Sequence, residues 1–127
     1  MAGIAHYTAF FRFMEAAEHA FFRSLGYSIH TKGFGDMGWP RVHAECDFKS
    51  PIRFEDMVEV HLLVKEKREK SLVYTFIFRV DGREVARGGL AVACVTRDAP
   101  SGKMRSIPIP AAIANQIEAA PKELFAC

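Results

Sequence analysis

The sequence predicts an α+β domain in which one long apolar helix is followed by an antiparallel sheet that curls around it. Three observations support this class: a helical hydrophobic pattern near the start, later segments in which apolar and polar residues alternate, and an Asp-Gly pair between two of those segments. The 127 residues suffice for one core, and no repeat or linker divides them. We therefore expect a single domain over residues 1–127.

The helix is expected from about residue 8 to residue 25. The hydroxyl group of Thr8 can cap the first turn, and Gly26 stands where a left-handed C-terminal cap is expected. Apolar residues recur every three or four positions, and three more phenylalanines widen the same face: Phe10, Met14, Ala17, Phe21 and Leu25, with Phe11, Phe13 and Phe22. We expect a sheet or a partner subunit to cover this helix, since each large side chain contributes roughly 1.5 to 3 kcal/mol when buried.

Residues 27–40 contain three glycines and end in a proline, a composition typical of a loop. Loops of this length inside compact domains are often functional. The aromatic residues Phe34 and Trp39 could line a ligand pocket, and covering the sheet edge explains them equally well. Both interpretations stay open at this point.

Strands are expected over residues 41–48, 57–65, 71–80 and 83–96, because apolar and polar residues alternate in each. In the first, one side carries Val42, Ala44, Cys46 and Phe48 and should face inward, and the other carries Arg41, His43, Glu45 and Asp47. Asp81 and Gly82 join the last two strands as a two-residue hairpin, since both residues tolerate positive φ. Residues 98–103 are expected to form a turn, residues 107–110 to be extended, and a short helix to run from Pro110 to about residue 119.

Charge and composition exclude several classes of function. The net charge is +2 and the basic residues are dispersed among acidic ones, so we expect no nucleic-acid partner. No apolar run approaches about 18 residues and no signal-peptide pattern opens the chain, so we expect a soluble protein without a membrane partner. The three cysteines, Cys46, Cys94 and Cys127, lack metal-ligand spacing. Cys46 and Cys94 lie in strand-like segments, where we expect buried thiols. We therefore expect no metal site and a cytoplasmic location.

A motif at the start of the chain carries a family resemblance. Ala2-Gly3-Ile4-Ala5-His6-Tyr7 leads into the helix, and Phe13-Met14-Glu15 follows inside it. This motif, followed by several long strands, resembles the hot-dog fold, specifically the 4-hydroxybenzoyl-CoA thioesterase-like branch of acyl-CoA thioesterases. The stretches PIRFEDMVEVHLLV and RSIPIP are similar to the family's second long strand and its tail. The resemblance therefore covers nearly the whole chain.

The resemblance implies hydrolysis of a fatty or aromatic acyl-CoA thioester, with coenzyme A as part of the substrate and no other cofactor. Elementary electrostatics agrees, because a thioester carbonyl at a helix start meets unpaired backbone N–H groups and the positive end of the helix dipole. The donors here would be the backbone N–H of Tyr7 and its neighbours. Gly3 would let the chain pass close to the substrate, with Ile4 beside it, and the ring of His6 or Tyr7 would contact the acyl group. A structural role for His6 remains an alternative.

Three basic residues, Arg97, Lys103 and Arg105, stand near the end of the last long strand. The resemblance implies that they bind the phosphates of coenzyme A, because family members place cations there. Three solvated surface charges would have the same pattern, so both interpretations stay open.

The family's catalytic aspartate would stand just before Ala2, where this chain has Met1. We expect either that the start is internal to a longer protein, with the first strand missing as well, or that the protein lacks this carboxylate. In the second case Glu15 is a substitute, although its eight-residue separation from Tyr7 corresponds to roughly 12 Å along the helix. A partner subunit could supply Glu15, or it could simply pair with His19 one turn on. Asp36 is a weaker substitute.

A single curled sheet around one helix leaves an edge strand open and part of the apolar helix bare. We therefore expect a homodimer at minimum, or a dimer of dimers, which is a homotetramer, with sites between subunits. A non-catalytic module that binds acyl-CoA or an acyl carrier is the alternative function. The cone of the steroid-isomerase-like proteins is the alternative fold.

Overall fold

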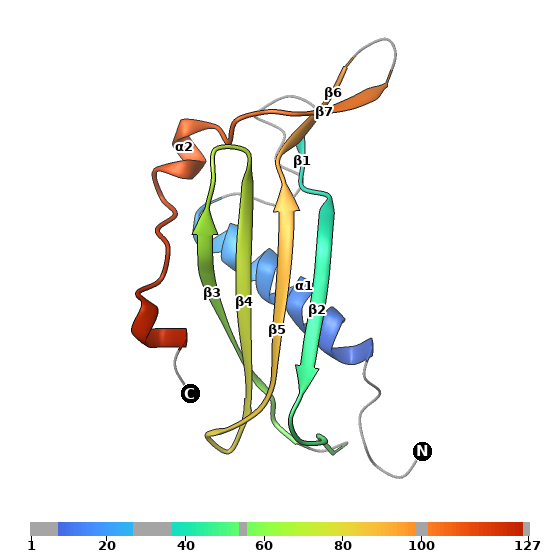
Figure 1. Cartoon of the computed structure of the whole chain (residues 1–127), viewed down its shortest axis with the longest axis vertical. Coiled ribbons are helices and arrows are strands. Elements are labelled where there is room, and N and C mark those ends of the chain that lie inside the picture. Colours follow the sequence, from blue (N-terminus) through green and yellow to red (C-terminus); the bar gives the residue numbers. More distant parts are fainter. Residues whose placement is uncertain (1–7, 27–36, 54–55, 99–101, 126–127) are drawn as a thin grey trace.

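The computed structural model describes residues 8–26, 37–53, 56–98 and 102–125 (Figure 1). The helices are α1 (Thr8–Ser24), α2 (Ala111–Ala114) and the 3-10 turn η2 (Lys122–Phe125). The strands are β1 (Met37–Gly38), β2 (Arg41–Phe48), β3 (Glu59–Lys67), β4 (Ser71–Val80), β5 (Arg83–Ala93), β6 (Val95–Asp98) and β7 (Lys103–Ser106). The expected long helix and long strands are thus confirmed.

A four-stranded antiparallel sheet forms the body of the fold, in the order β2-β5-β4-β3. A second sheet, in the order β1-β6-β7, continues from its end. Figure 1 shows α1 crossing one face of the larger sheet obliquely, from the side of β2 toward the side of β3. Asp81 and Gly82 make the predicted hairpin between β4 and β5, both with positive φ.

The core lies between α1 and the sheet. From the helix, Phe10, Met14 and Phe22 are buried, and from β4 the alternate residues Leu72, Tyr74, Phe76 and Phe78 are buried against them. The alternation in β4 and the helical period in α1 therefore direct these residues inward, and Phe10, Met14 and Phe22 of the predicted helix face are buried. On the opposite side of α1, Phe11 is 37% exposed, so the described part of one copy does not cover the whole apolar surface of the helix.

The prediction of a helix from Pro110 to residue 119 was too long, because α2 ends at Ala114. Lys67 explains where the helix stops: its Nζ donates to the carbonyls of Ala114 and Ile117, at 3.0 and 2.8 Å. A side chain from β3 thus binds the carbonyl of the last helical residue, Ala114, and a carbonyl of the segment that follows the helix. The chain then runs along β3, where the N–H of Ala120 donates to the carbonyl of Val64.

The predicted strand over residues 83–96 breaks at Cys94. The N–H of Cys94 donates to Lys70 O, and its carbonyl accepts from the N–H of Ile107, so both groups leave the sheet ladder. The chain then enters the smaller sheet as β6, which pairs with β7 around the predicted turn. Cys94 is buried, as expected, and Cys46 is half-buried.

Arg41 does not face outward, so this part of the alternation prediction was wrong. The register between β2 and β5 shifts between Arg41 and His43, which is a β-bulge. Arg41 pairs with the buried Val92 and therefore lies on the helix side of the sheet. Val42, expected inside, is 66% exposed.

Candidate functional site

The candidate site is the beginning of α1. Gly3, Ile4, His6 and Tyr7 lie outside the described residues, as do Phe34 and Asp36, and their roles stay predictions. The first turn of α1 contains no acidic residue. The positive end of the helix dipole is therefore not neutralised by a carboxylate of that turn, which suits a developing negative charge on a substrate oxygen.

An aromatic cluster lies against the first turns of α1. Phe10 contacts Phe48 at the end of β2 and Phe78 on β4, with ring centroids 4.9 and 5.1 Å apart. Phe13 makes edge contact with Phe10 at 6.0 Å. Phe48 is 50% exposed, so the cluster extends from the core to the surface beside the helix start. It can offer apolar surface to an acyl group near that helix end.

Two predicted residues lie elsewhere on the helix. Glu15 is exposed on the side of α1 that does not pack against the sheet. Trp39 is buried and its ring contacts Phe22, near the far end of α1, at a centroid distance of 5.2 Å. The structure therefore brings neither of them to the beginning of the helix of their own chain.

The β6–β7 hairpin separates the three predicted cations onto two faces. Arg97 pairs with Met104, whereas Arg105 pairs with Thr96, so the side chains of Arg97 and Arg105 project from opposite faces. Lys103 is two residues from Arg105 and shares its face. All three cations are exposed. Lys103 and Arg105 are therefore the pair that could hold one phosphate group together.

The hairpin and the helix start lie at opposite ends of β2. The hairpin follows the end of β5, which pairs with Arg41, and the helix start contacts Phe48. Seven residue steps along β2 correspond to about 23 Å. Figure 1 shows the same arrangement, with β6 and β7 beyond one end of the sheet and the beginning of α1 toward the other.

A buried charged residue, Glu18, escaped the sequence-based prediction. Its side chain is fully buried, and its Oε1 accepts a 2.5 Å hydrogen bond from Nη2 of Arg41. Glu18 Oε2, Tyr74 Oη and Trp39 Nε1 are also buried, and within the described part of the chain none of them has a partner at hydrogen-bond geometry. The signal was present in the helical period, because Phe10, Met14, Glu18 and Phe22 are four residues apart, which places a carboxylate in the apolar row.

Burial raises the pKa of Glu18 above its ordinary value, although the guanidinium of Arg41 opposes this effect. Burial and the neighbouring Glu18 carboxyl also raise the pKa of Tyr74 above its usual range. Glu15, on the same helix, adds a smaller repulsion that further raises the pKa of Glu18. The carboxyl group of Glu18 therefore depends on Arg41 for its charge.

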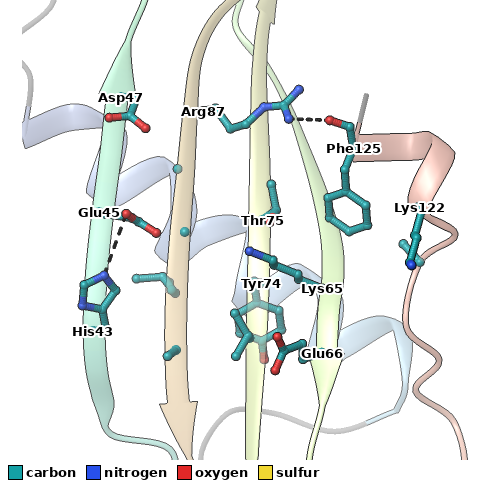
Figure 2. A pocket seen from close by; sticks show the side chains of 16 residues that line it. His43, Glu45, Asp47, Lys65, Glu66, Tyr74, Thr75, Arg87, Lys122 and Phe125 are labelled. Carbon is teal, nitrogen blue, oxygen red and sulfur yellow. Dashed lines mark hydrogen bonds and ion pairs between the residues drawn. The ribbon is translucent and has the colours of Figure 1, made fainter. Parts of the chain in front are cut away.

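A groove of about 500 Å³ lies on the sheet face that is turned away from α1 (Figure 2). His43, Glu45 and Asp47 form one wall, and the C-terminal segment with Lys122 and Phe125 forms the other. Arg87 lies between them and donates to the carbonyl of Phe125 at 2.6 Å and to Glu84. Of the predicted site residues that the structure describes, which are Glu15, Trp39, Arg97, Lys103 and Arg105, none lines this groove.

The described residues contain no group of three acidic, histidine or cysteine side chains that could hold a metal ion. Within the same residues, no helix is long and apolar enough to cross a membrane. Among the described residues, the beginning of α1 offers backbone donors, the helix dipole and apolar surface.

Comparisons with known proteins agree with this geometry. The family model of the thioesterase superfamily matches residues 2–86. A relative from Aquifex aeolicus (strain VF5), named "Putative esterase", is 32% identical over 108 residues, which are 84% of this chain and 80% of the relative.

Solved structures share the fold over most of their length. A gentisyl-coenzyme A thioesterase superposes with a TM-score of 0.76 at 29% identity, over 88% of this chain and 87% of the other. The 4-hydroxybenzoyl-CoA thioesterase of Pseudomonas sp. strain CBS-3 superposes with a TM-score of 0.77 over 91% and 88% of the two chains; at 22% identity, this likeness shows the fold alone. These findings confirm the resemblance noted in the sequence, and the chain therefore belongs to the thioesterase superfamily, as a thioester hydrolase with the hot-dog fold.

Proposed function

We propose that this protein hydrolyses the thioester bond of a fatty or aromatic acyl-CoA, with the thioester carbonyl polarised by backbone N–H groups at the beginning of α1. The observation that carries the proposal is the helix start itself, which has no acidic residue in its first turn and has the Phe10 cluster beside it. One such donor contributes roughly 3 to 4 kcal/mol to the transition state. The family match over residues 2–86 and the thioesterases among the structural neighbours support the reaction class.

The proposal includes a homodimer, because β2 is an edge strand among the described strands and carries exposed apolar side chains, Val42 and Phe48. Two copies of β2 that pair antiparallel about a two-fold axis place the Phe48 end of one strand beside the Arg41 end of the other. The hairpin of the second copy then approaches the helix start of the first. Lys103 and Arg105 of the second copy would bind the phosphates of coenzyme A.

The proposal is tested by incubating the protein with aromatic and with short, medium and long fatty acyl-CoA thioesters. Hydrolysis is followed by the loss of thioester absorbance, because the three cysteines would react with a thiol reagent. We expect saturable turnover well above the uncatalysed rate for one acyl class. Saturable binding without turnover would instead support a module that binds acyl-CoA, and the absence of both would contradict the proposal.

A further inference from the structure

The β-bulge in β2 has a specific structural result. Without it, regular alternation would place Val42 on the helix side and Arg41 on the outer side. The register shift between Arg41 and His43 reverses this, so that Arg41 reaches Glu18 across the interface and Val42 is exposed instead. Bulges that re-aim one side chain are frequent beside active sites. Here the re-aimed side chain joins the edge strand to the central helix.

Stability alone does not account for this ion pair. Glu18 is fully buried and loses its hydration, while the side chain of Arg41 remains 34% exposed. An apolar pair of similar size is often as stabilising as a buried ion pair, or more so. Phe10, Met14 and Phe22, in the same helical row, already pack in the core. The ion pair adds a defined geometry. Its 2.5 Å hydrogen bond fixes the position of Glu18 Oε1 relative to Arg41 Nη2, whereas an apolar contact between the same two elements would allow several relative positions.

Within the described residues, the ion pair is one contact that joins α1 to the edge strand β2. At the other end of the strand, Phe10 packs edge-on against Phe48. The contacts are eight residues apart on the helix, about 12 Å, and seven apart on the strand, about 23 Å. Helix and strand therefore cross obliquely, and these two contacts join α1 to β2 at two separate points, while β3, β4 and β5 support the rest of the helix. Phe48 is half-exposed, so the polar contact is the more restrictive of the two.

We propose that Glu18 and Arg41 are positioning residues for the hydrolytic reaction: together they hold the beginning of α1 at a fixed place relative to the edge strand β2. The inference rests on the proposed function, in which that helix end polarises the substrate carbonyl and β2 pairs with a second copy. Neither residue touches the substrate. Their effect passes through the helix, because a displacement of about 1 Å at a reacting group can reduce a rate about 100-fold.

The test replaces the ion pair by apolar side chains of similar size, in the double variant E18M/R41M. We expect the variant to remain folded and dimeric, with a kcat reduced about 10- to 100-fold and a KM for acyl-CoA within about twofold of the unchanged protein, because the loss falls on the transition state. The matched control is E66M/R68M, which removes an exposed ion pair between Glu66, near the end of β3, and Arg68, just after that strand, and should leave both constants unchanged.

A folded E18M/R41M protein whose kcat stays within about twofold of the unchanged protein would overturn the inference. If this variant does not fold, the double variant E18Q/R41Q, which removes both charges and leaves neither unpaired in the core, replaces it and must show the same division between kcat and KM. Hydrogen exchange supplies a second measurement, and the amides of the first turn of α1 should exchange faster in the variant. Failure of the proposed function would give a different result, because the wild-type protein would then hydrolyse none of the thioesters. In that case the exchange rates of the α1 amides alone would test whether Glu18 and Arg41 hold the helix in place.

Discussion

Met14 lies directly over Gly88, and this contact sets how closely α1 approaches the sheet. A Cβ atom at position 88 would lie 2.6 Å from Met14 Sδ and 3.3 Å from the carbonyl oxygen of Glu45. Glycine is therefore the residue that lets the middle of the helix pack against β5.

The first prediction concerns this contact. Gly88→Ala should lower the free energy of unfolding by about 1 to 3 kcal/mol, because the added methyl group overpacks the site. Urea denaturation measures the change. Gly38→Ala is the control, since a Cβ there meets only Val95 at an ordinary 3.9 Å. Equal stability of both variants would show that Met14 can move aside freely.

The second prediction concerns Glu84, which accepts hydrogen bonds from Arg87 and Lys49. These bonds lower the pKa of Glu84 below its ordinary value of 4.5, so the carboxylate contributes stability above that pH and loses it as the pH falls through the lowered pKa. Glu84→Gln should therefore cost about 1 kcal/mol at pH 7 and nothing in strong acid. Denaturation at both pH values tests this, with Glu59→Gln on β3 as the control. If Glu84→Gln lowered the free energy of unfolding by the same amount at both pH values, this prediction would be contradicted.

The third prediction concerns the edge strand. Val42→Lys should raise the dissociation constant of the dimer by at least about tenfold, which is 1.4 kcal/mol, because a charge would then stand beside the open edge of β2. Analytical ultracentrifugation measures it. Met104→Lys replaces a similarly exposed apolar residue on the hairpin and should leave the dissociation constant of the dimer unchanged. A monomeric unchanged protein would refute the dimer itself.

The fourth prediction separates the hairpin cations by face. Lys103→Ala or Arg105→Ala should raise the KM for acyl-CoA about tenfold, since a hydrogen bond to a charged group contributes roughly 1.5 to 3 kcal/mol. Arg97→Ala, on the opposite face, should change it little. A short acyl thioester without the nucleotide should show no difference among the three variants. If all three substitutions raised the KM equally, the cations would act through their total charge, and the assignment of the phosphates to one face of the hairpin would be contradicted.

The long, strongly periodic elements were predictable from the sequence. The period of α1, the alternation of β4 and the Asp81-Gly82 turn each have a local physical cause, and the structure reproduces them. The inward orientation of Arg41 was not predictable from the sequence, because the β-bulge that causes it depends on how β2 pairs with β5. The alternating pattern of β2 gives no sign of this bulge. The end of α2 likewise depends on Lys67, a residue from a distant strand.

The candidate site was predicted less completely than the fold. Glu18 could have been found, since it interrupts an apolar row at four-residue spacing, but its partner depends on the bulge. Arg97 lies on the opposite face of the hairpin from Lys103 and Arg105 because of the register between β6 and β7. The spacing of the basic residues in the sequence does not reveal this register. Residues that meet only through tertiary pairing are thus the ones that sequence patterns miss.

The most direct measurement removes the backbone donor that the sequence predicts at residue 7, just before the described part of α1. Tyr7→Pro deletes the N–H of residue 7, and proline is well suited to the first positions of a helix. We predict that kcat for acyl-CoA hydrolysis falls about 100- to 1,000-fold, whereas Tyr7→Phe, which keeps the N–H and the ring, remains within a few-fold of the unchanged protein. A folded Tyr7→Pro protein that hydrolyses acyl-CoA at the unchanged rate would contradict the assignment of the helix start as the site that polarises the thioester.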